Sequence, residues 1–519
     1  AKTRYDYLSS DRTQFLDEAE QAAELTLPYL IDRDQYTKGM RNLPTPWQSV
    51  GAKGAVTLAA KLMQSMLPVQ TSFFKLQVDE SQLGQEFGPQ IKSELDLSFA
   101  KIERTILEAI AASNDRVVLH EALLHLVVAG NALIFMDKDG LKVYPLSRYV
   151  VERDGNGNVI EIITKETIAK NLIADQLPED ILKEYDSVVD SSPDNVDECD
   201  IYTHITRDNN RYVWHQEVHG KILEKSYGKA PVDVSPWIPL RFNTVDGEDY
   251  GRGRVGQFIG DLKSLEALSQ ALVEGSAAAA KVVFTVSPSS TTKPSTLANA
   301  GNGAIVQGRP DDIGVVQVGK TADFRTAFEM MQTLERRLNE AFLVMQVRQS
   351  ERTTAEEVRL TQMELEQQLG GLFSLLTTEF LLPYLNRILN QFQKTGKIPR
   401  LPKDIVKPTI VAGVNALGRG QDRESLGQFL TVISQTMGPE AVQKFINPEE
   451  VIKRLAASQG IDVLNLVRSM QEIQGEQQQA QQMAMQQQQQ DQQVAMMKTP
   501  MMDPSKNPAL AEQMQAPPQ

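Results

Sequence analysis

The strongest constraint on the fold comes from the middle of the chain, residues 253–394. Two segments rich in alanine and leucine, 256–281 and 322–343, have helical spacing of their apolar residues and bracket an irregular insert rich in Gly, Ser, Thr and Pro. A short polar connection and a longer helix follow. A helix that leaves, an insert that turns back and a helix that returns predict a projecting stalk with a tip. Such a shape suits spanning rather than enclosing a substrate, and it argues against catalysis.

Length and composition set the general class of the protein. A chain of 519 residues is too long for a single core, so about two to four domains are expected. No stretch reaches roughly 18 apolar residues without charges, so we expect no membrane span. The N-terminal sequence AKTRYDYLSSDRTQF lacks the apolar run of a signal peptide. Cys199 is the only cysteine, which excludes an intrachain disulfide and fits a reducing compartment.

The acidic charge is concentrated in the first half of the chain. The net charge is −14, and residues 1–250 hold 26 Lys and Arg against 40 Asp and Glu, which gives −14 for that half alone. Residues 251–350 carry 11 basic and 9 acidic side chains, a net of +2. Tight nucleic-acid binding depends largely on neutralising phosphates, so an acidic chain is a poor candidate for it. Such a surface could still let a polyanion slide past without adhering.

The order of the predicted elements indicates an α+β protein that is mainly helical. Helical spacing dominates the first third, including a buried helix at 116–130 that runs into a strand. Strand patterns then flank two hairpin turns, Asp154–Gly157 and Asn209–Asn210. The insert 282–321 begins with a short strand and predicts a small β-rich unit. Helices are expected again over about 409–470, and the Gln- and Met-rich tail beyond them is expected to be disordered.

One glycine run resembles a cofactor motif. Residues Gly251–Gly256, with the sequence GRGRVG, fit the dinucleotide fingerprint G-x-G-x-x-G. A possible strand at 238–243 precedes the run, but a polar loop intervenes and no βαβ unit follows. The alternative is a flexible start of a helix, in which Arg252 and Arg254 are solvated or contact a neighbouring chain.

Other signs of chemistry are weak. His120 and His125 are five residues apart on a helix, whereas a shared metal would need a spacing of four. His215 and His219 flank a strand without a carboxylate set beside them. The acidic pairs at 311–312 and 356–357 are better explained by capping of a turn and a helix start. We therefore expect no metal, no cofactor and no enzymatic activity.

The polar loop MQVRQSER at 345–352 is the candidate contact site. It lies between two predicted helices and carries Arg348 and Arg352 against Glu351. A solvated connection is the simplest interpretation. If several copies faced a common axis, however, the loop would form a collar of polar and basic side chains. Such a collar could touch a phosphate backbone without reading sequence.

At this point the chain resembles the head-to-tail connector, or portal, family of T7-like podoviruses. The shared motifs keep their order over roughly residues 1–430, and the match fades beyond. They include TPWQSVGAKG at 45–54, LVVAGNALI at 126–134, YPLSRYVVERDGNGNV at 144–159, GEDYGRGRVGQFIGDLKSLEALSQA at 247–271, RTTAEEVR at 352–359 and LGGLFSLLTTEFLLP at 369–383.

The resemblance implies a ring of about twelve copies at one capsid vertex, through which double-stranded DNA is packaged and ejected. It also implies a portal fold of wing, stem, clip and crown. The corresponding ranges are wing 1–255, stem 256–281 and 322–344, clip 282–321, channel loop 345–352, a long helix and return at 353–408 in the wing, crown 409–475 and tail 476–519.

The resemblance further implies which partners and residues take part. The partners would be further copies of the chain, the terminase large subunit, the tail adaptor, the major capsid protein and scaffolding or internal core proteins. The protein would be made in the bacterial cytoplasm and reside in the virion at the head–tail junction, without a membrane. In the clip, Lys293 and Arg309 are candidate contacts, though both could equally be solvated. The channel-loop candidates are Gln346, Arg348, Gln349, Glu351 and Arg352.

Two other functions stay open at this stage. One is a helical adaptor or scaffold protein without a pore, which the same helices could build. The other is a nucleotide-binding enzyme that uses Gly251–Gly256, which would require a parallel sheet.

Overall fold

The computed structural model divides the chain into two compact units, Ala1–Leu417 and Gly418–Gln519. In the second unit, residues 429–436 form a helix, and the predicted crown and tail otherwise lie almost entirely outside the described residues. The structure describes residues 1–31, 43–68, 72–78, 89–137, 140–169, 198–280, 283–289, 293–301, 305, 307, 309, 311, 313–316, 321–344, 370–401, 406–410, 427, 429–436 and 451.

A central helix, α4 (Asp115–Ala129), organises the first unit and contacts both α1 (Lys2–Glu24) and α2 (Val50–Met66). Its sequence is apolar on almost every side, so residues 122–129 are all buried. Helix α3 (Pro89–Ala112) packs against it as well. The predicted buried helix that runs into a strand is confirmed, because α4 ends at the left-handed Gly130 and strand β2 begins one residue later.

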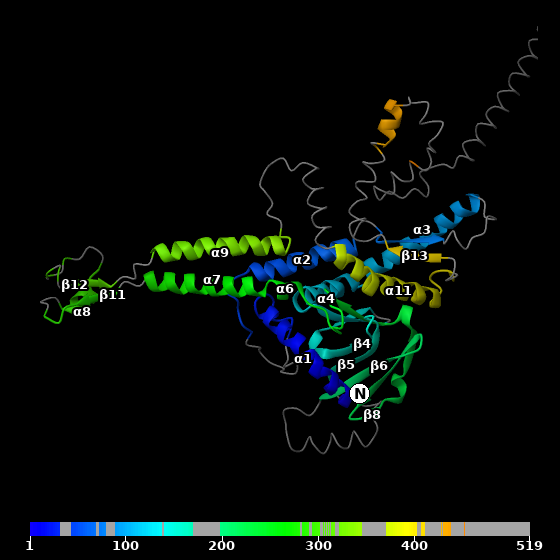
Figure 1. Cartoon of the computed structure of the whole chain (residues 1–519), viewed down its shortest axis with the longest axis horizontal. Helices are drawn as coiled ribbons and strands as arrows, with labels where there is room; N and C mark the ends of the chain where they lie inside the picture. The colour runs from blue at the N-terminus through cyan, green and yellow to red at the C-terminus, as the bar shows by residue number, and fades with distance from the viewer. Residues whose placement is uncertain are drawn as a thin grey trace, which may run out of the picture. The chain divides into compact units, whose positions relative to one another are not determined.

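Two antiparallel sheets follow α4 in the chain (Figure 1). Both predicted hairpins are confirmed: Gly157, with φ of 79°, lies in the β4–β5 turn, and Asn209, with φ of 53°, lies in the β6–β7 turn. The smaller sheet has the order β10 (Trp237–Arg241), β2 (Asn131–Met136) and β3 (Leu141–Tyr144). The larger contains β4 (Tyr149–Arg153), β5 (Val159–Ala169), β6 (Glu198–Asp208), β7 (Arg211–Val218) and β8 (Lys221–Ile222), with β9 (Gly228–Pro231) paired to β7.

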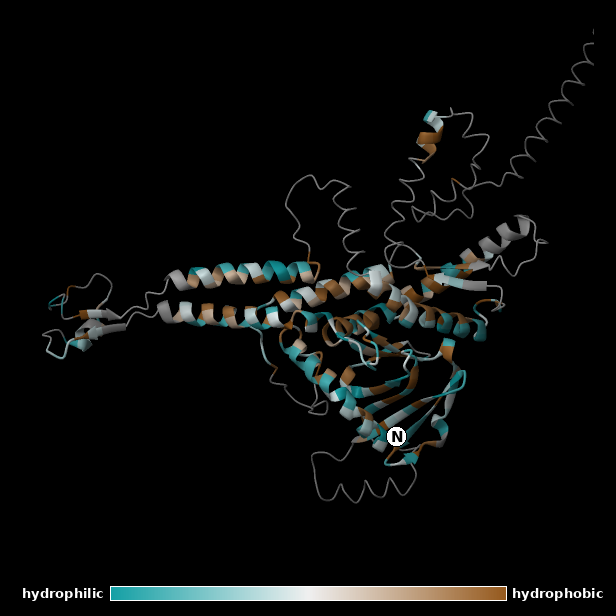
Figure 2. Cartoon of the chain, viewed as in Figure 1, coloured by the Kyte–Doolittle hydropathy of each residue, from teal (hydrophilic) through white to brown (hydrophobic). Residues whose placement is uncertain are grey.

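The two helices predicted in the middle of the chain are confirmed, and they pack against each other (Figure 1). The first begins with a separate turn, α6 (Arg254–Gln257), and continues as α7 (Ile259–Ala280); the second is α9 (Thr321–Ala341). We call α7 and α9 the helix pair. Apolar and polar residues alternate along both helices (Figure 2), as expected for elements that bury one side only.

The insert between these helices is a small β unit, as predicted. Strand β11 (Val283–Val286) pairs antiparallel with β12 (Ile313–Val316), and the short helix α8 (Pro294–Ala298) lies between them in sequence. The predicted short strand of the segment VVFTVSP is therefore confirmed. A two-stranded sheet has little core of its own.

The long helix predicted from residue 353 is described from residue 370 onward. It is helical at 370–376, makes a π-helical turn at Thr377–Leu381 and continues as α11 (Leu382–Lys394). The π turn directly precedes Pro383, which has no N–H to donate to the carbonyl of residue 379. Strand β13 (Val406–Ile410) then pairs antiparallel with β1 (Phe74–Val78), and neither strand of this pair was predicted.

One hydrophobic core connects these parts. It joins α1, α2, α4 and the sheets to the inner ends of α7 and α9 and to residues 372–398. The helix pair is thus continuous with the sheet-bearing part of the unit and is not a separate body. Among the residues that the structure describes, no helix is both long and apolar enough to cross a membrane. Within the same residues, no cluster of three or more His, Cys, Asp or Glu side chains forms a metal site.

His125 gives this core a defined pH dependence. It lies on α4, is 3% exposed, and its Nδ1 has no hydrogen-bond partner among the described residues. Burial lowers the pKa of His125 to about 4. Between pH 6.5 and 4 the unfolded chain therefore binds a proton that the folded chain does not, and stability falls as the pH is lowered, by up to ~3 kcal/mol.

We expect the thermal unfolding midpoint of the wild type to drop more steeply between pH 6.5 and pH 4.5 than that of His125→Leu. The substitution removes the group that takes up the proton on unfolding. His120→Leu is the matched control, because it removes a half-buried histidine from the same helix, and it is expected to keep the wild-type slope. Equal slopes for the wild type and His125→Leu would contradict this account.

Candidate functional site at the inner end of the helix pair

The five residues predicted for the channel loop lie outside the described residues, and their role stays a prediction: Gln346, Arg348, Gln349, Glu351 and Arg352. The two candidate contacts of the insert are described, and both are exposed. Lys293 directly precedes α8, and its carbonyl oxygen accepts a hydrogen bond from the Thr296 amide at 3.0 Å. Arg309 lies in the connection that leads to β12. Both cations are therefore accessible to a partner, and their contact role stays a prediction.

The point where the chain leaves α9 toward residues 345–352 is built in detail. Leu343 adopts a left-handed conformation, with φ of 57°, which is costly for a residue with a side chain. The amide of Val344 donates to the Asn339 carbonyl at 2.7 Å, and that of Leu343 donates to Glu340 at 3.0 Å. These two bonds form a Schellman motif, which stops the helix and turns the chain at a fixed place.

Two cations complete the end of α9. Arg254 donates from Nε and Nη2 to the Ala341 carbonyl at 3.2 and 2.9 Å, and its guanidinium lies 5.0 Å from the centre of the Phe258 ring. The ammonium group of Lys61, on α2, donates to the Leu343 carbonyl. Cations favour the negative end of a helix dipole. Burial lowers the pKa of both Lys61 and Arg254, as expected for cations withdrawn from water.

We call these four residues, Lys61, Arg254, Ala341 and Leu343, the exit clamp. The clamp joins three segments that are distant in sequence: α2, the turn that starts the first helix of the pair, and the end of the second. It therefore fixes the position of Leu343 and Val344, where the described chain leaves α9. Sequence reasoning missed the clamp, since nothing in the pattern around Lys61 marks it as a helix cap.

Close packing of α2 supports the clamp. A Cβ atom added at Gly54 would lie 2.6 Å from Cγ of Phe342, and one at Gly51 would lie 2.6 Å from the Leu25 carbonyl oxygen. Phe342 is fully buried there. Gly54 thus lets Phe342, at the end of α9, approach the backbone of α2 directly, and Gly51 does the same for the residue that follows α1.

The glycine run that resembles a nucleotide fingerprint has a packing role. A Cβ atom at Gly253 would lie 2.6 Å from the Val128 carbonyl oxygen, and one at Gly251 would lie 2.8 Å from that of Gly130. The side chain of Asn131 forms two hydrogen bonds with Gly251, accepting from its amide and donating to its carbonyl, each at 2.7 Å. The run is therefore pressed against the end of α4.

The two arginines of this run are half-buried and have partners within the chain, whereas their contact with a neighbouring chain stays a prediction. Arg252 forms ion pairs with Glu248 at 2.7 Å and with Glu18 at 3.2 Å, and Arg254 belongs to the exit clamp. The strand pairs that the structure describes are all antiparallel. Within the described part, the parallel βαβ setting that a dinucleotide site requires is missing.

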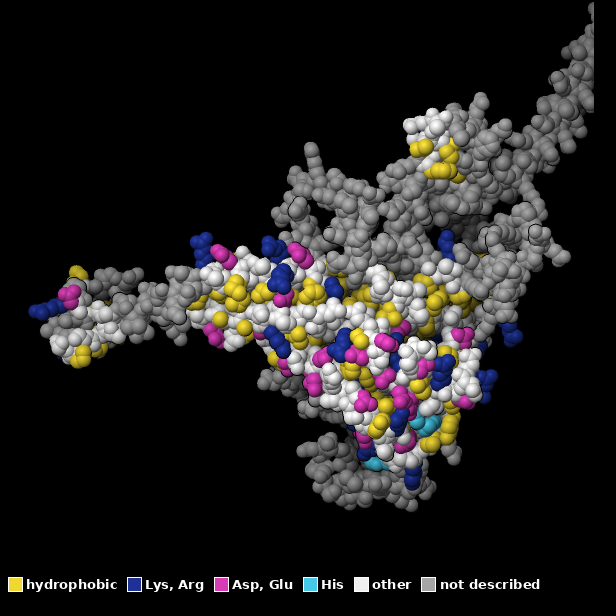
Figure 3. Space-filling model, viewed as in Figure 1, with side chains coloured by type: hydrophobic (Ala, Val, Ile, Leu, Met, Phe, Trp, Pro, Cys, Tyr) yellow, Lys and Arg dark blue, Asp and Glu magenta, His cyan; other side chains and the backbone are white. Residues whose placement is uncertain are grey.

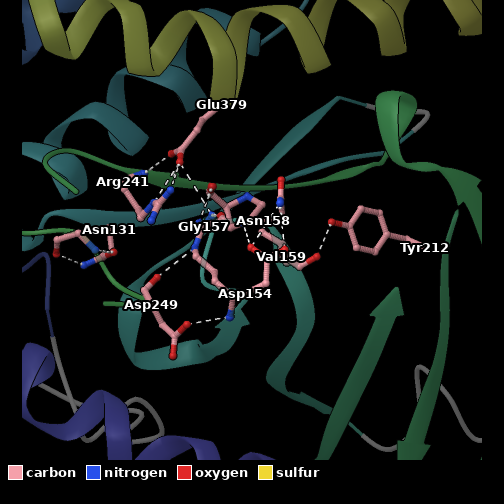
Figure 4. A network of polar contacts seen from close by, with 12 residues as sticks. Asn131, Asp154, Gly157, Asn158, Val159, Tyr212, Arg241, Asp249 and Glu379 are labelled. Atoms are coloured by element: carbon pink, nitrogen blue, oxygen red, sulfur yellow. Dashed lines mark hydrogen bonds and ion pairs between the residues drawn. The ribbon is translucent and has the colours of Figure 1, made fainter. Parts of the chain in front are cut away.

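A second polar site follows residues 345–369 in the chain and lies in the helix that is described from residue 370 onward. Glu379, in the π-helical turn, accepts from Nη2 and Nε of Arg241 at 2.7 and 3.0 Å and from the Arg241 backbone amide at 3.0 Å (Figure 4). Arg153 lies 3.8 Å from the same carboxylate. Burial lowers the pKa of the Arg153 guanidinium, and the Glu379 carboxylate opposes that effect. A single glutamate within the apolar run LGGLFSLLTTEFLLP was a sequence signal for such a pair.

The π turn aligns a series of polar contacts along one side of this helix. It inserts one residue between Glu379 and Tyr384, so that Glu379 faces β10 and Tyr384 faces the start of α4 although they are five positions apart. The partners extend from β10 to the start of α4. The contacts are Glu379 with Arg241, Tyr384 Oη with Asp115 at 2.5 Å, Arg387 with the Val234 carbonyl at 3.2 Å and Gln391 with the Asp137 carbonyl at 3.4 Å.

Replacing Glu379 with Gln is expected to lower the midpoint of thermal unfolding strongly. The substitution keeps the shape of the side chain but leaves two buried arginines without a carboxylate, and breaking a buried pair costs about 3–5 kcal/mol. Calorimetry of the assembled protein measures the effect. Glu329→Gln is the matched control, because Glu329 pairs with Arg325 at an exposed site worth about 0.3–0.5 kcal/mol. A shift no larger than that of the control would contradict a structural role for the Glu379 pair.

Comparison with known proteins identifies relatives over most of the chain. It is similar to the portal protein of Escherichia phage T7, at 37% identity over 91% of this chain and 89% of the relative. It is similar to the portal protein of Enterobacteria phage T3, at 38% identity over 90% of this chain and 88% of the relative. The portal protein of Enterobacteria phage SP6 is 30% identical, with 85% of each chain covered.

The family described as "Bacteriophage head to tail connecting protein" matches residues 1–466. That range contains the sheets, the helix pair with its insert, the exit clamp and the Glu379 site. The family expected from the sequence motifs is therefore confirmed over nearly the whole chain. The chain belongs to the bacteriophage head to tail connecting proteins.

Proposed function

We propose that this chain is a portal protein, which forms a ring at one vertex of a phage capsid and conducts double-stranded DNA during packaging and ejection. The observation that carries the proposal is the family match over residues 1–466, together with portal relatives at 37 and 38% identity over about nine tenths of the chain. The role is structural rather than catalytic, and it needs no cofactor.

The parts of the chain take the following places in this proposal. The sheets and α1 to α4 belong to the wing, the helix pair forms the stem, and the two-stranded insert forms the clip. The exit clamp then lies at the junction of stem, wing and channel loop. The proposed ranges are wing 1–255, stem 256–281 and 322–344, clip 282–321, channel loop 345–352, long helix and return 353–408, crown 409–475 and tail 476–519.

Charge supports passage of DNA without adhesion. About twelve chains at −14 each would give a ring of roughly −170, and such a wall repels phosphates. Salt at physiological strength confines that field to about 8–10 Å, so DNA near the axis would experience little long-range force. Arg348 and Arg352 would then act as local contacts for the phosphate backbone, without sequence readout.

The exit clamp supports the assignment of the loop at 345–352. A loop that contacts moving DNA must start from a rigid point, since otherwise contact with DNA would displace its base. The Schellman motif at Leu343 and the two cations of the clamp provide such a point immediately before residue 345. The far side is held through Glu379 and Arg241.

The proposed partners follow from this place in the virion. The exposed clip would meet the terminase large subunit during packaging and the tail adaptor afterwards, with Lys293 and Arg309 as its charged contacts. The wing would meet the major capsid protein, and the crown would meet scaffolding or internal core proteins. The protein would be made in the bacterial cytoplasm and then reside at the head–tail junction.

Electron microscopy of the purified protein tests the ring. Annular particles with a central hole are the expected result. Compact or filamentous particles without a hole would instead favour the adaptor or scaffold alternative. The nucleotide-binding alternative would require saturable NAD binding by the purified protein, and absence of such binding would count against it.

Replacing both Arg348 and Arg352 with Ala tests the loop. We expect ring assembly to stay intact and genome packaging or retention to fall, because the substitutions remove the local phosphate contacts. The readouts are electron microscopy of rings and the DNA content of particles complemented with the variant. Lys293→Ala is a comparison at the clip, where any loss should accompany weaker terminase or adaptor binding. Wild-type DNA content with the doubly substituted loop would refute the contact role.

A further inference from the structure

The two sides of the helix pair differ in a regular way. The helices pack antiparallel, with Ser269 Oγ 3.7 Å from Met331 Sδ, and a Cβ atom at Gly275 would lie 2.6 Å from the Phe324 ring. These contacts define the side that each helix buries against the other. The side chains next to that buried side therefore form two flanks of the pair, and each flank contains residues of both helices. Figure 3 shows apolar and charged side chains together on the visible side of the pair.

One flank carries bulky apolar side chains. Glu266 accepts a hydrogen bond from the Trp47 amide at 2.8 Å and so marks this side of α7. Val273 lies seven residues after Glu266 and therefore on the same flank, and it is 53% exposed. On α9 the same flank carries Phe328, which is 48% exposed, and Glu335, which lies seven residues after it. We call this set the bulky flank.

The opposite flank is shallow and carries an arginine. The ion pair of Arg337 with Asp261, at 3.4 Å, marks this side of the pair. Met330 lies seven residues before Arg337 and is 54% exposed. On α7 the same side carries the exposed, small residues Ser264 and Ala271, which are also seven residues apart. We call this set the shallow flank.

The two flanks match each other in height. Val273 and Ala271 are two residues apart on α7, and so are Phe328 and Met330 on α9, and Glu335 and Arg337. Residues two positions apart differ in height by only about 3 Å along the helix axis, and their side chains point to opposite sides. In a closed ring the copies are related by rotation alone, so in a helix pair that runs along the ring axis each residue meets a neighbour's residue at about its own height.

We infer that the bulky flank of one copy packs onto the shallow flank of the next copy, and that this contact joins the stems around the ring. The inference rests on the proposed function and adds the surface that the copies share. Val273 would fit beside the neighbour's small Ala271, Phe328 beside its flexible Met330, and Glu335 opposite its Arg337. Both size and charge are then complementary. The contact is heterologous, which is the type that closes into rings.

A second copy is the occupant that these observations favour. A second copy of this chain offers its shallow flank to the bulky flank and its bulky flank to the shallow flank. A different protein would need separate surfaces that match each of the two flanks. Isologous pairing would set a bulky flank against a bulky flank or a shallow flank against a shallow flank, which loses the complementarity of size and of charge.

A pair of cysteines on one helix tests the contact. In a chain with Cys199→Ala, which removes the only native cysteine, we combine Ala271→Cys with Val273→Cys. Two positions apart on a helix, these thiols point to opposite sides and cannot bond within one chain. Oxidation of purified protein should therefore give a ladder of chain multiples on a non-reducing gel, which a reductant collapses. Each single cysteine variant is the matched control and should stay monomeric on the gel.

The outcomes separate this inference from the proposed function. Annular particles that give no ladder would overturn the inference and leave the ring in place. A product that stops at the dimer would also overturn it, since that result indicates a two-fold contact. Absence of annular particles in the unsubstituted protein would overturn the proposed function and this contact with it. If the α7 variant fails to assemble, Phe328→Cys combined with Met330→Cys on α9 gives the same test on the other helix.

Discussion

Two hydrogen bonds between the side chain of Asn131 and the backbone of Gly251 join the end of α4 to the glycine run from which the helix pair starts. Asn131 is 1% exposed and directly follows the left-handed Gly130 that ends α4. A buried amide left without partners would cost about 1–3 kcal/mol, so this position tolerates little displacement of the glycine run. Because α6 begins three residues after Gly251, the pairing also determines where the first helix of the pair starts.

Contacts lead from this pairing to the segments that precede and follow residues 345–369 in the chain. In one direction, Arg254 follows the glycine run and holds the end of α9 through the Ala341 carbonyl. In the other, Arg241 lies opposite Asn131 in the β10–β2 register and holds Glu379. The segment that contains the proposed channel loop is thus flanked in sequence by two polar contacts, Arg254 with Ala341 and Arg241 with Glu379. Both contacts are connected to the β10–β2 strand pair, one through Asn131 and the other through Arg241.

Much of this arrangement was accessible from the sequence, and the failures have physical causes. Apolar periodicity identified both helices of the pair, and turn residues identified the hairpins at 154–157 and 209–210, because these signals are local. The β1–β13 pair was missed since its strands are more than 320 residues apart, and local pattern carries no information about such a pairing. The glycine run was ambiguous because its steric reason, the closeness of Val128 and Gly130, exists only in the fold.

The π turn could have been predicted from the spacing of apolar residues in the long helix. One set of buried residues in the long helix recurs every four positions, and Phe373, Leu381, Leu385 and Leu389 are buried beside it: Leu372, Leu376, Phe380, Tyr384 and Ile388. In a regular α-helix such a repeat drifts by about 40° at each step and would leave the core within a few turns. One π turn offsets much of the drift, which keeps Glu379 facing β10 and Tyr384 facing the start of α4. The same extra residue that places Glu379 against Arg241 therefore also keeps the apolar stripe buried, so anchor and core depend on a single irregularity.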